Sequence, residues 1–211
     1  MSPIFVWNHD TWMMLIGLGV TGLIVFLVFA LESRRYQRCR EFLEREARKF
    51  NGKVISESKY SIPSMRLIYH DIELHVYVTP MRSGRVSSQP STLHVLATFP
   101  WQTPYWFCIY FRNNPPVKFG VPEGGASLFM EKFAEGFTLQ CNDRDFAQSL
   151  LTNDCRKAIK QIMSERPVLF YQKDSFRLSL PFPLITGELF AKIFEPVKIV
   201  ISRLNELGQY Q

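Results

Sequence analysis

Residues that commonly carry catalysis or bind metals are scarce in this chain. Its 211 residues include four cysteines and four histidines. No two cysteines are spaced as C-x-x-C, and no histidine lies near a cysteine in the sequence, which argues against a zinc site. We therefore expect four reduced, partly buried thiols rather than a metal centre.

Nucleotide-binding motifs are missing as well. The glycine-rich residues 120–127 lack the Gly-Lys-Ser/Thr ending of a phosphate loop. Gly17, Gly19 and Gly22 match the letters of the dinucleotide fingerprint G-x-G-x-x-G, but they lie inside an apolar run instead of between a strand and a helix. The chain is predicted to bind no cofactor and not to be an enzyme.

His70 and His75 flank two carboxylates, Asp71 and Glu73, and such a grouping could hold a metal ion. On a strand, however, residues five apart point to opposite faces, and a hairpin turn at His70 would separate the two rings further. We interpret this segment as a solvated turn and strand face.

Ionisable side chains are absent from Thr11 to Leu31, a run of 21 residues. As a helix the run would be about 32 Å long, close to the thickness of the bilayer hydrocarbon. Val28-Phe29-Ala30 has the spacing of a signal-peptidase site, but no Lys or Arg precedes the run, and a signal-peptide core has only roughly 7 to 15 residues. We predict a retained transmembrane helix over residues 11–31, after a short outer N-terminus over residues 1–10.

The charge distribution predicts the orientation of the transmembrane helix. Lys and Arg next to a span resist translocation and stay on the cytoplasmic side. None precedes the run, and four arginines follow it closely: Arg34, Arg35, Arg38 and Arg40. The N-terminus is therefore expected outside and the rest in the cytoplasm, at a bacterial inner membrane or an equivalent cell membrane. Trp7 and Trp12 fit an outer membrane-interface belt, although ordinary hydrophobic residues near a helix start would look the same.

Small residues within the run offer a helix-packing face. Gly17 and Thr21 are four residues apart and would leave a shallow groove for a neighbouring membrane helix. A lone anchor with incidental glycines is an equally good interpretation.

The net charge of +6 is spread along the chain, with −1 in residues 1–31, +3 in residues 32–49 and +4 in the remainder. A basic cytoplasmic domain is attracted to an anionic leaflet. We expect the lipid bilayer and other transmembrane proteins of a complex as partners, and no nucleic acid, because the membrane anchor already explains the strongest basic cluster.

Residues 32–50 are predicted to continue the helix as a basic, amphipathic juxtamembrane segment. Spacings of three and four residues form an apolar stripe of Tyr36, Cys39, Leu43, Ala47 and Phe50. The stripe is too short for a coiled coil, so we expect it to pack against the chain's own domain. Asn51-Gly52 then supplies a pair that tolerates a left-handed C-cap.

Beyond residue 50 the pattern predicts one cytoplasmic α+β domain over residues 51–207. Its first half is a mainly antiparallel sheet of four or five strands, expected at residues 54–56, 65–69, 72–78, 92–99 and 105–111. A connector rich in proline and glycine follows at residues 112–125. The second half is a strand, a helical region, a hairpin and a final helix, expected at residues 137–141, 146–162, 168–180 and 186–207. Asn142 is expected to start the helical region, Thr152 to recap it, and Pro196 to kink or restart the final helix.

The second half carries a short pattern of residues. It consists of Phe137 to Cys141, Asp145, Ala147, Ser149 to Thr152, Arg156 and Ile159. In this pattern the chain resembles a group of uncharacterised bacterial membrane-anchored proteins, over about residues 50–205. The resemblance implies an extended-sheet half followed by this second half, and it implies no activity. The residues themselves are typical of a strand core, a helix cap and a helix core.

Aromatic side chains are dense over residues 101–111, where Trp101, Tyr105 and Trp106 stand close together. A core strand with its entry turn explains them most simply. A partner surface is the alternative, because Trp and Tyr are enriched at the centres of interfaces.

Two classes of function stay open. The first is a non-catalytic accessory, scaffold or assembly subunit that docks a cytoplasmic domain onto a larger integral-membrane complex. Its layout is similar to that of the H-type subunit of bacterial photosynthetic reaction centres, so a photosynthetic or respiratory complex is a candidate by analogy of layout alone. The second is an independent membrane-tethered domain that senses or binds a ligand in a pocket between its two halves.

Overall fold

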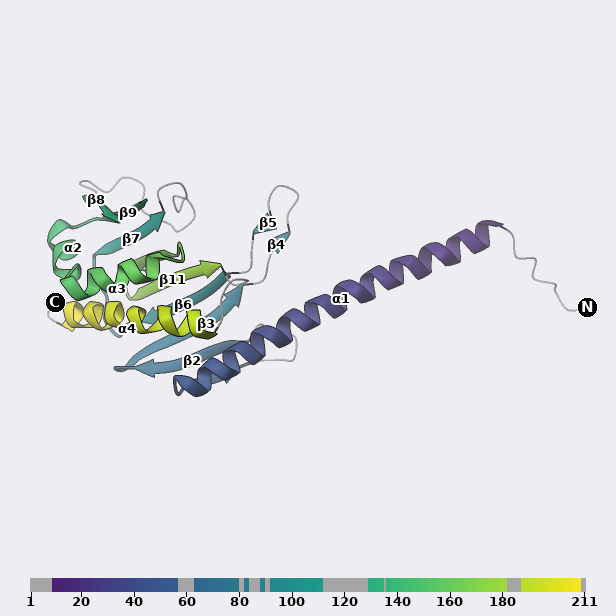
Figure 1. Ribbon diagram of the computed structural model, residues 1–211, viewed down its shortest axis with the longest axis horizontal. Helices are drawn as coiled ribbons and strands as arrows, with labels where there is room; N and C mark the ends of the chain where they lie inside the picture. The colour runs from purple at the N-terminus through teal and green to yellow at the C-terminus, as the bar shows by residue number, and fades with distance from the viewer. Residues whose placement is uncertain are drawn as a thin grey trace, which may run out of the picture.

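The computed structural model describes residues 9–56, 63–79, 82–83, 88–89, 92–111, 129–134, 136–181 and 187–209. Figure 1 shows a long N-terminal helix that projects from a domain in which helices lie against a broad sheet. The protein therefore has the predicted α+β fold, with one long apolar helix at its N-terminus.

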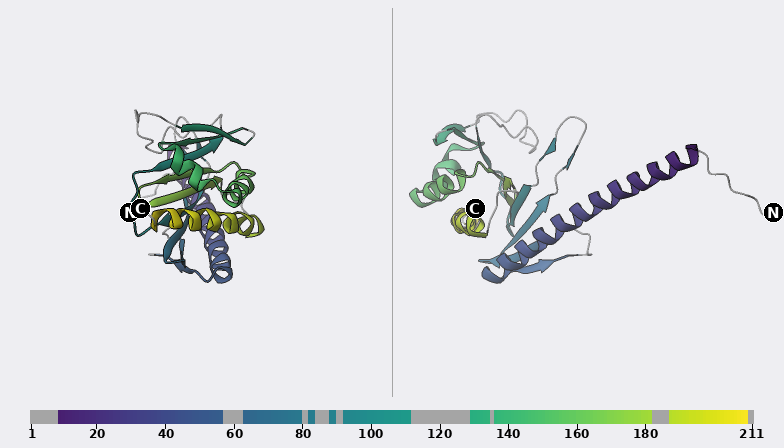
Figure 2. Two further views of the ribbon diagram at one scale, coloured as in Figure 1. Left: turned by 90° about the vertical axis from the view of Figure 1, so that its left-hand side faces the viewer. Right: turned by 45° about the vertical axis from the view of Figure 1, so that its right-hand side comes forward.

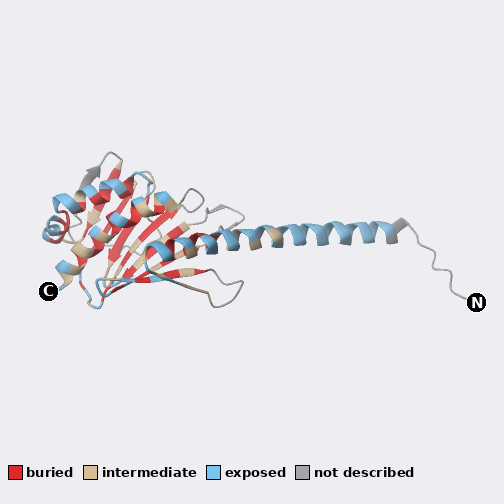
Figure 3. Ribbon diagram, turned by 60° about the horizontal axis from the view of Figure 1, so that its bottom comes forward, coloured by how far each residue is buried: buried red, intermediate tan, exposed pale blue. Residues whose placement is uncertain are grey.

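Helix α1 runs without interruption from His9 to Lys49 and has 41 residues. Its first half is exposed, and its last turns enter the core of the domain (Figure 3). Leu43 and Ala47 of the predicted apolar stripe are buried there. The helix ends as predicted, because Asn51 adopts a left-handed φ of 56° and Gly52 N–H donates to the Ala47 carbonyl at 2.8 Å.

The strands form one antiparallel sheet of nine strands with a separate two-stranded ribbon. In space the order of the large sheet is β1-β2-β3-β6-β11-β10-β7-β9-β8. Its strands are β1 (Lys53–Ile55), β2 (Ser64–Tyr69), β3 (Ile72–Thr79), β6 (Thr92–Thr98), β7 (Trp106–Phe111), β8 (Phe129–Ala134), β9 (Phe137–Cys141), β10 (Val168–Gln172) and β11 (Ser175–Pro181). The ribbon pairs β4 (Arg82–Ser83) with β5 (Ser88–Gln89).

The sequence pattern predicts every strand of the large sheet except β8, but it places β7 wrongly. β7 was expected beside the strands of the first half. Instead the hairpin β10–β11 inserts between β6 and β7, with β11 paired to β6 and β10 paired to β7. This interior position suits β7, because its residues Trp106 to Tyr110 are buried on both faces of the sheet.

Two tight turns have the left-handed backbone that such hairpins require. His70 and Asp71, between β2 and β3, have φ values of 48° and 61°. Lys173, between β10 and β11, has a φ of 56°. Both hairpins lie where the sequence predicts them.

The helical region is split in two as predicted, but its first cap differs from the prediction. Helix α2 (Arg144–Leu150) is capped by Asp143, whose carboxylate accepts from Phe146 N–H at 2.6 Å. Asn142 is not the cap, because its side-chain oxygen accepts from Trp106 N–H at 2.8 Å and so ties it to β7. Helix α3 (Asn153–Met163) starts after Thr152, as expected.

Helix α4 (Gly187–Gln209) includes Pro196, where the sequence predicts a kink or a restart, and the helix does not restart there. Proline has no N–H to donate to the carbonyl four residues earlier, which belongs to Lys192. That carbonyl accepts from the side-chain amide of Gln161 on α3 at 3.3 Å. A neighbouring helix thus supplies the hydrogen bond that the proline removes. Thr186, the expected cap of this helix, lies outside the described residues.

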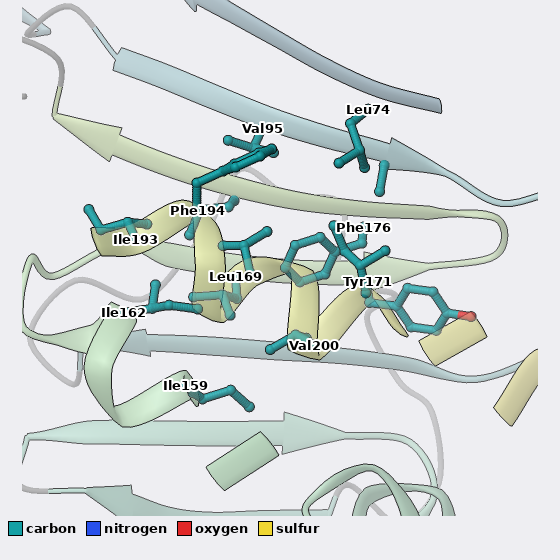
Figure 4. Close-up of a cluster of buried hydrophobic side chains, with 14 of the residues drawn as sticks. Leu74, Val95, Ile159, Ile162, Leu169, Tyr171, Phe176, Ile193, Phe194 and Val200 are labelled. Carbon is teal, nitrogen blue, oxygen red and sulfur yellow. The ribbon is translucent and has the colours of Figure 1, made fainter. Parts of the chain in front are cut away.

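The helices α3 and α4 and the last turns of α1 cover one face of the sheet (Figure 2). Figure 4 shows side chains of the strands, such as Val95 and Phe176, in one cluster with Ile162 of α3 and Phe194 of α4. All four are buried. A second, smaller cluster lies on the opposite face and consists of Trp106, Cys108, Tyr110 and Phe170.

Candidate functional site

The apolar first half of α1 is exposed along its length. Of the exposed large hydrophobic side chains among the described residues, all but Ile68 and Ile199 lie between Trp12 and Leu31. Within the described part of the chain, α1 is the one helix long and apolar enough to cross a membrane, and the domain buries none of its most apolar stretch. A surface of this length and character fits lipid better than water.

The predicted helix-packing face at Gly17, like the other glycines of the apolar stretch, has open space beside it. A Cβ added at Gly17, Gly19 or Gly22 would meet nothing within 4 Å. The Thr21 hydroxyl donates to the Gly17 carbonyl at 2.8 Å, so its polar group is satisfied inside the helix. This face can therefore receive another helix without exposing an unpaired hydroxyl.

The basic flank lies between the apolar half of α1 and the domain. Arg34, Arg38 and Arg40 are exposed there, and Arg40 Nε pairs with Glu44 Oε1 at 2.8 Å. Trp12 is 56% exposed at the other end of the apolar stretch. Trp7 and the side chain of Arg35 lie outside the described residues, so both stay predictions.

Aromatic contacts join the end of α1 to the start of α4. Phe42 meets Phe190 edge-on with ring centroids 5.7 Å apart, and Phe50 meets Phe194 at 4.7 Å. Phe42, Phe190 and Phe194 are buried. Since α1 is continuous, these contacts connect the apolar half to the core of the domain.

A buried carboxylate stands at the same junction, and the sequence analysis did not single it out. Glu46 of α1 has no exposed surface, and its Oε1 lies 3.1 Å from Lys49 Nζ and 3.3 Å from Arg45 Nε. It faces the first residue of α4, where a Cβ added to Gly187 would lie 2.5 Å from Glu46 Oε1. A carboxylate beside a helix N-terminus is favourably placed in the field of the helix dipole.

Trp101 packs against the C-terminal part of α4. Its indole Nε1 donates to Asn205 Oδ1 at 3.2 Å. The ring also covers Gly208 so closely that an added Cβ would overlap it. Residue 208 must therefore lack a side chain as long as Trp101 keeps this position.

Tyr105 and Trp106 lie elsewhere. Tyr105 stacks on Phe146 of α2 with ring centroids 4.8 Å apart. Trp106 is buried in the cluster on the opposite face of the sheet, beside Cys108. The three aromatic residues thus do not form one continuous surface, and their use by a partner stays a prediction.

A polar network on the second face of the sheet crosses three strands. His94 of β6 lies 3.1 Å from Thr79 Oγ1 through Nε2 and 2.9 Å from Ser179 Oγ through Nδ1. Burial, with a smaller effect of the Arg177 charge, lowers the pKa of His94 to about 4. The imidazole is therefore neutral at pH 7, and both of its nitrogens are occupied by hydroxyl groups.

The cysteines are in the state that the sequence predicts. All four are free and buried. Burial raises the pKa of Cys39 to about 11 and that of Cys155 to about 12, so neither is a thiolate at neutral pH. Among the described residues, no group of three His, Cys, Asp or Glu side chains is placed to hold a metal ion.

The two halves of the domain are joined by a strand ladder. β6 and β11 are paired over seven residues, from Thr92↔Pro181 to Thr98↔Ser175. An open depression of about 540 Å³ also lies between the two halves, lined by residues 102–106 of the first half and by Asn142 and the turn of the β10–β11 hairpin of the second half. The Asn142 amide there already donates to the Pro104 carbonyl at 2.9 Å.

No protein-family model and no curated protein matches the chain. Among solved structures, the fold is similar to the crystal structure of the mycobacterial trehalose monomycolate transport factor A, TtfA, with a TM-score of 0.51 and 4% sequence identity. The similarity covers 79% of this chain and 92% of that chain. At this identity it shows the fold alone. The lack of a family match is consistent with the resemblance to an uncharacterised family.

Proposed function

We propose that the chain is a single-pass protein of a bacterial inner membrane or an equivalent membrane, with its N-terminus outside and its domain in the cytoplasm. The exposed apolar stretch of α1, from Trp12 to Leu31, supports the span. The four arginines of the basic flank follow this stretch and none precedes it, which supports the orientation.

Its role in this proposal is that of a non-catalytic accessory, scaffold or assembly subunit, which docks the domain onto a larger integral-membrane complex. The observation that carries the proposal is the packed junction between α1 and α4, because a partner that binds the span is then held beside the domain. The open face around Gly17 and Thr21 supports a partner helix in the membrane.

Two further observations support this role. The solved structure with a similar fold is named as a transport factor, not as an enzyme. The buried thiols and the neutral, doubly hydrogen-bonded His94 are also poor nucleophiles and bases.

Native gels and mass analysis of the tagged full chain, extracted in mild detergent, test the proposal. We expect integral-membrane proteins to co-migrate with the chain. Gly17→Leu should weaken this association by filling the packing face, whereas the same change at Gly19, which points to another side of the helix, should preserve it. Migration of the unaltered chain as a lone monomer would refute the accessory role.

A further inference from the structure

The ribbon β4–β5 is a continuation of the hairpin formed by β3 and β6. β3 and β6 end their pairing at Thr79↔Thr92. Three residues further along each strand are Arg82 and Gln89, and these two are paired with each other. The two ladders therefore share one register, and the hairpin extends beyond the edge of the large sheet.

The neighbouring strands do not accompany this extension. The first residue of β2, Ser64, pairs with Tyr77, and the last residue of β11, Pro181, pairs with Thr92. Past this level β4 and β5 pair only with each other among the described strands. The ribbon is thus a projection from the domain.

The ribbon projects in the direction of the apolar half of α1. The chain reverses at Asn51 and Gly52, so β1 runs back along α1, and β3 runs in the same direction as β1 because β2 lies antiparallel between them. Figures 1 and 2 both show β4 and β5 at the end of the domain from which α1 leaves.

The rise per residue along strand β3 and along helix α1 places the ribbon at the level of the membrane boundary. Gly52 is hydrogen-bonded to Ala47, and the neighbouring Lys53 is in register with His75 of β3 through β2. From His75 to Arg82 a strand rises about 23 Å. From Ala47 back to Leu31 the helix rises about 24 Å. Arg82 therefore stands at about the height of Leu31, where the apolar run ends and lipid headgroups begin.

The charge of the ribbon suits that position. Residues 80–91 contain two arginines and neither Asp nor Glu. Each basic residue at an anionic surface strengthens the attraction by roughly fivefold. We propose that the β4–β5 ribbon, through Arg82, contacts anionic phospholipid headgroups of the inner leaflet and forms a second membrane contact beside α1.

This contact rests on the proposed transmembrane role of α1. It would also restrict the orientation of the domain relative to the membrane. A single helix can tilt and rotate within a bilayer. Two separate contacts at the same height fix the angle at which the domain stands on the membrane. The far end of the domain, which includes Lys173 and the open depression, is then held toward the cytoplasm.

Fluorescence quenching in bilayers tests the proposal with the full chain. Single labels would be attached to Ser83→Cys on the ribbon, Lys173→Cys at the far end and Val25→Cys within the span, since all four native thiols are buried. The membranes would be vesicles of phosphatidylcholine with or without phosphatidylglycerol, and they would carry a quencher on either the headgroups or the acyl chains.

We expect the headgroup quencher to act several-fold more strongly at residue 83 than at residue 173, and more strongly when phosphatidylglycerol is present. Arg82→Glu should reduce the quenching at residue 83 at least fivefold, whereas Lys173→Glu should leave it unchanged. Equal quenching at residues 83 and 173, or quenching at residue 83 that does not depend on phosphatidylglycerol, would refute the proposed ribbon contact. If acyl-chain quenchers also failed to act at residue 25, the proposed span itself would be wrong.

Discussion

The junction between α1 and α4 makes a sharp prediction through Glu46 and Gly187. Gly187→Ala places a methyl group 2.5 Å from Glu46 Oε1 and must push this buried carboxylate aside. Overpacking of this kind costs about 1–3 kcal/mol, from which the better helix propensity of alanine recovers up to about 1 kcal/mol. We expect a net loss of about 1–2 kcal/mol in the free energy of unfolding.

Glu46→Ala removes the carboxylate from the same space. Its partners Lys49 and Arg45 are 49% and 61% exposed, so water can solvate them, and the lost pairs contribute at most about 1 kcal/mol each. With the cavity left behind, the expected cost is about 1–3 kcal/mol. In this background Gly187→Ala should become neutral or stabilising, because its methyl group enters the vacated space.

The double-mutant cycle should therefore show a coupling of about 1–3 kcal/mol between the two sites. Urea unfolding of the full chain in mild detergent, followed by tryptophan fluorescence, measures the four variants of the cycle. Additive costs would refute the view that Glu46 packs against the start of α4. The exposed pair Arg40 and Glu44 on the same helix provides a control that should give a coupling below about 0.5 kcal/mol.

Two further predictions concern the domain alone. Gly208→Ala should displace the indole of Trp101 and break its hydrogen bond to Asn205. We expect the free energy of unfolding in urea to fall by about 1–3 kcal/mol. A native-like tryptophan emission with unchanged stability would contradict this prediction. The pKa of His94 is lowered on folding to about 4 from 6.5, so the folded state binds fewer protons. Stability should be full above about pH 6.5 and fall as the pH drops toward 4, by about 1–2 kcal/mol after allowance for partial solvent screening. His94→Gln should flatten this pH dependence of the unfolding free energy, and an unchanged slope would argue against the assignment.

The elements of the fold followed from local patterns. In β3, Ile72, Leu74 and Val76 are buried while Glu73 is exposed, and alternation of this kind shows in the sequence itself. The positive φ values at His70 and Asp71 likewise follow from the turn that joins two such strands. Local rules of this kind place helices, strands and turns.

The order of the strands could not be predicted in the same way. β7 follows β6 in the sequence, but the hairpin β10–β11, from much later in the chain, lies between them. The packing of Trp101 on Gly208 and of Glu46 against Gly187 joins residues more than 100 positions apart. Contacts of this range leave no periodic signal in a single sequence.

Labelling of intact cells tests the proposed placement of the chain in the membrane. Ser2→Cys and Asp71→Cys would be introduced separately into the full chain and treated with a membrane-impermeant maleimide, before and after permeabilisation. We expect residue 2 to react in intact cells and residue 71 to react only after the membrane is permeabilised. Labelling of residue 71 from outside, or recovery of the full chain in the soluble fraction, would contradict the proposed placement.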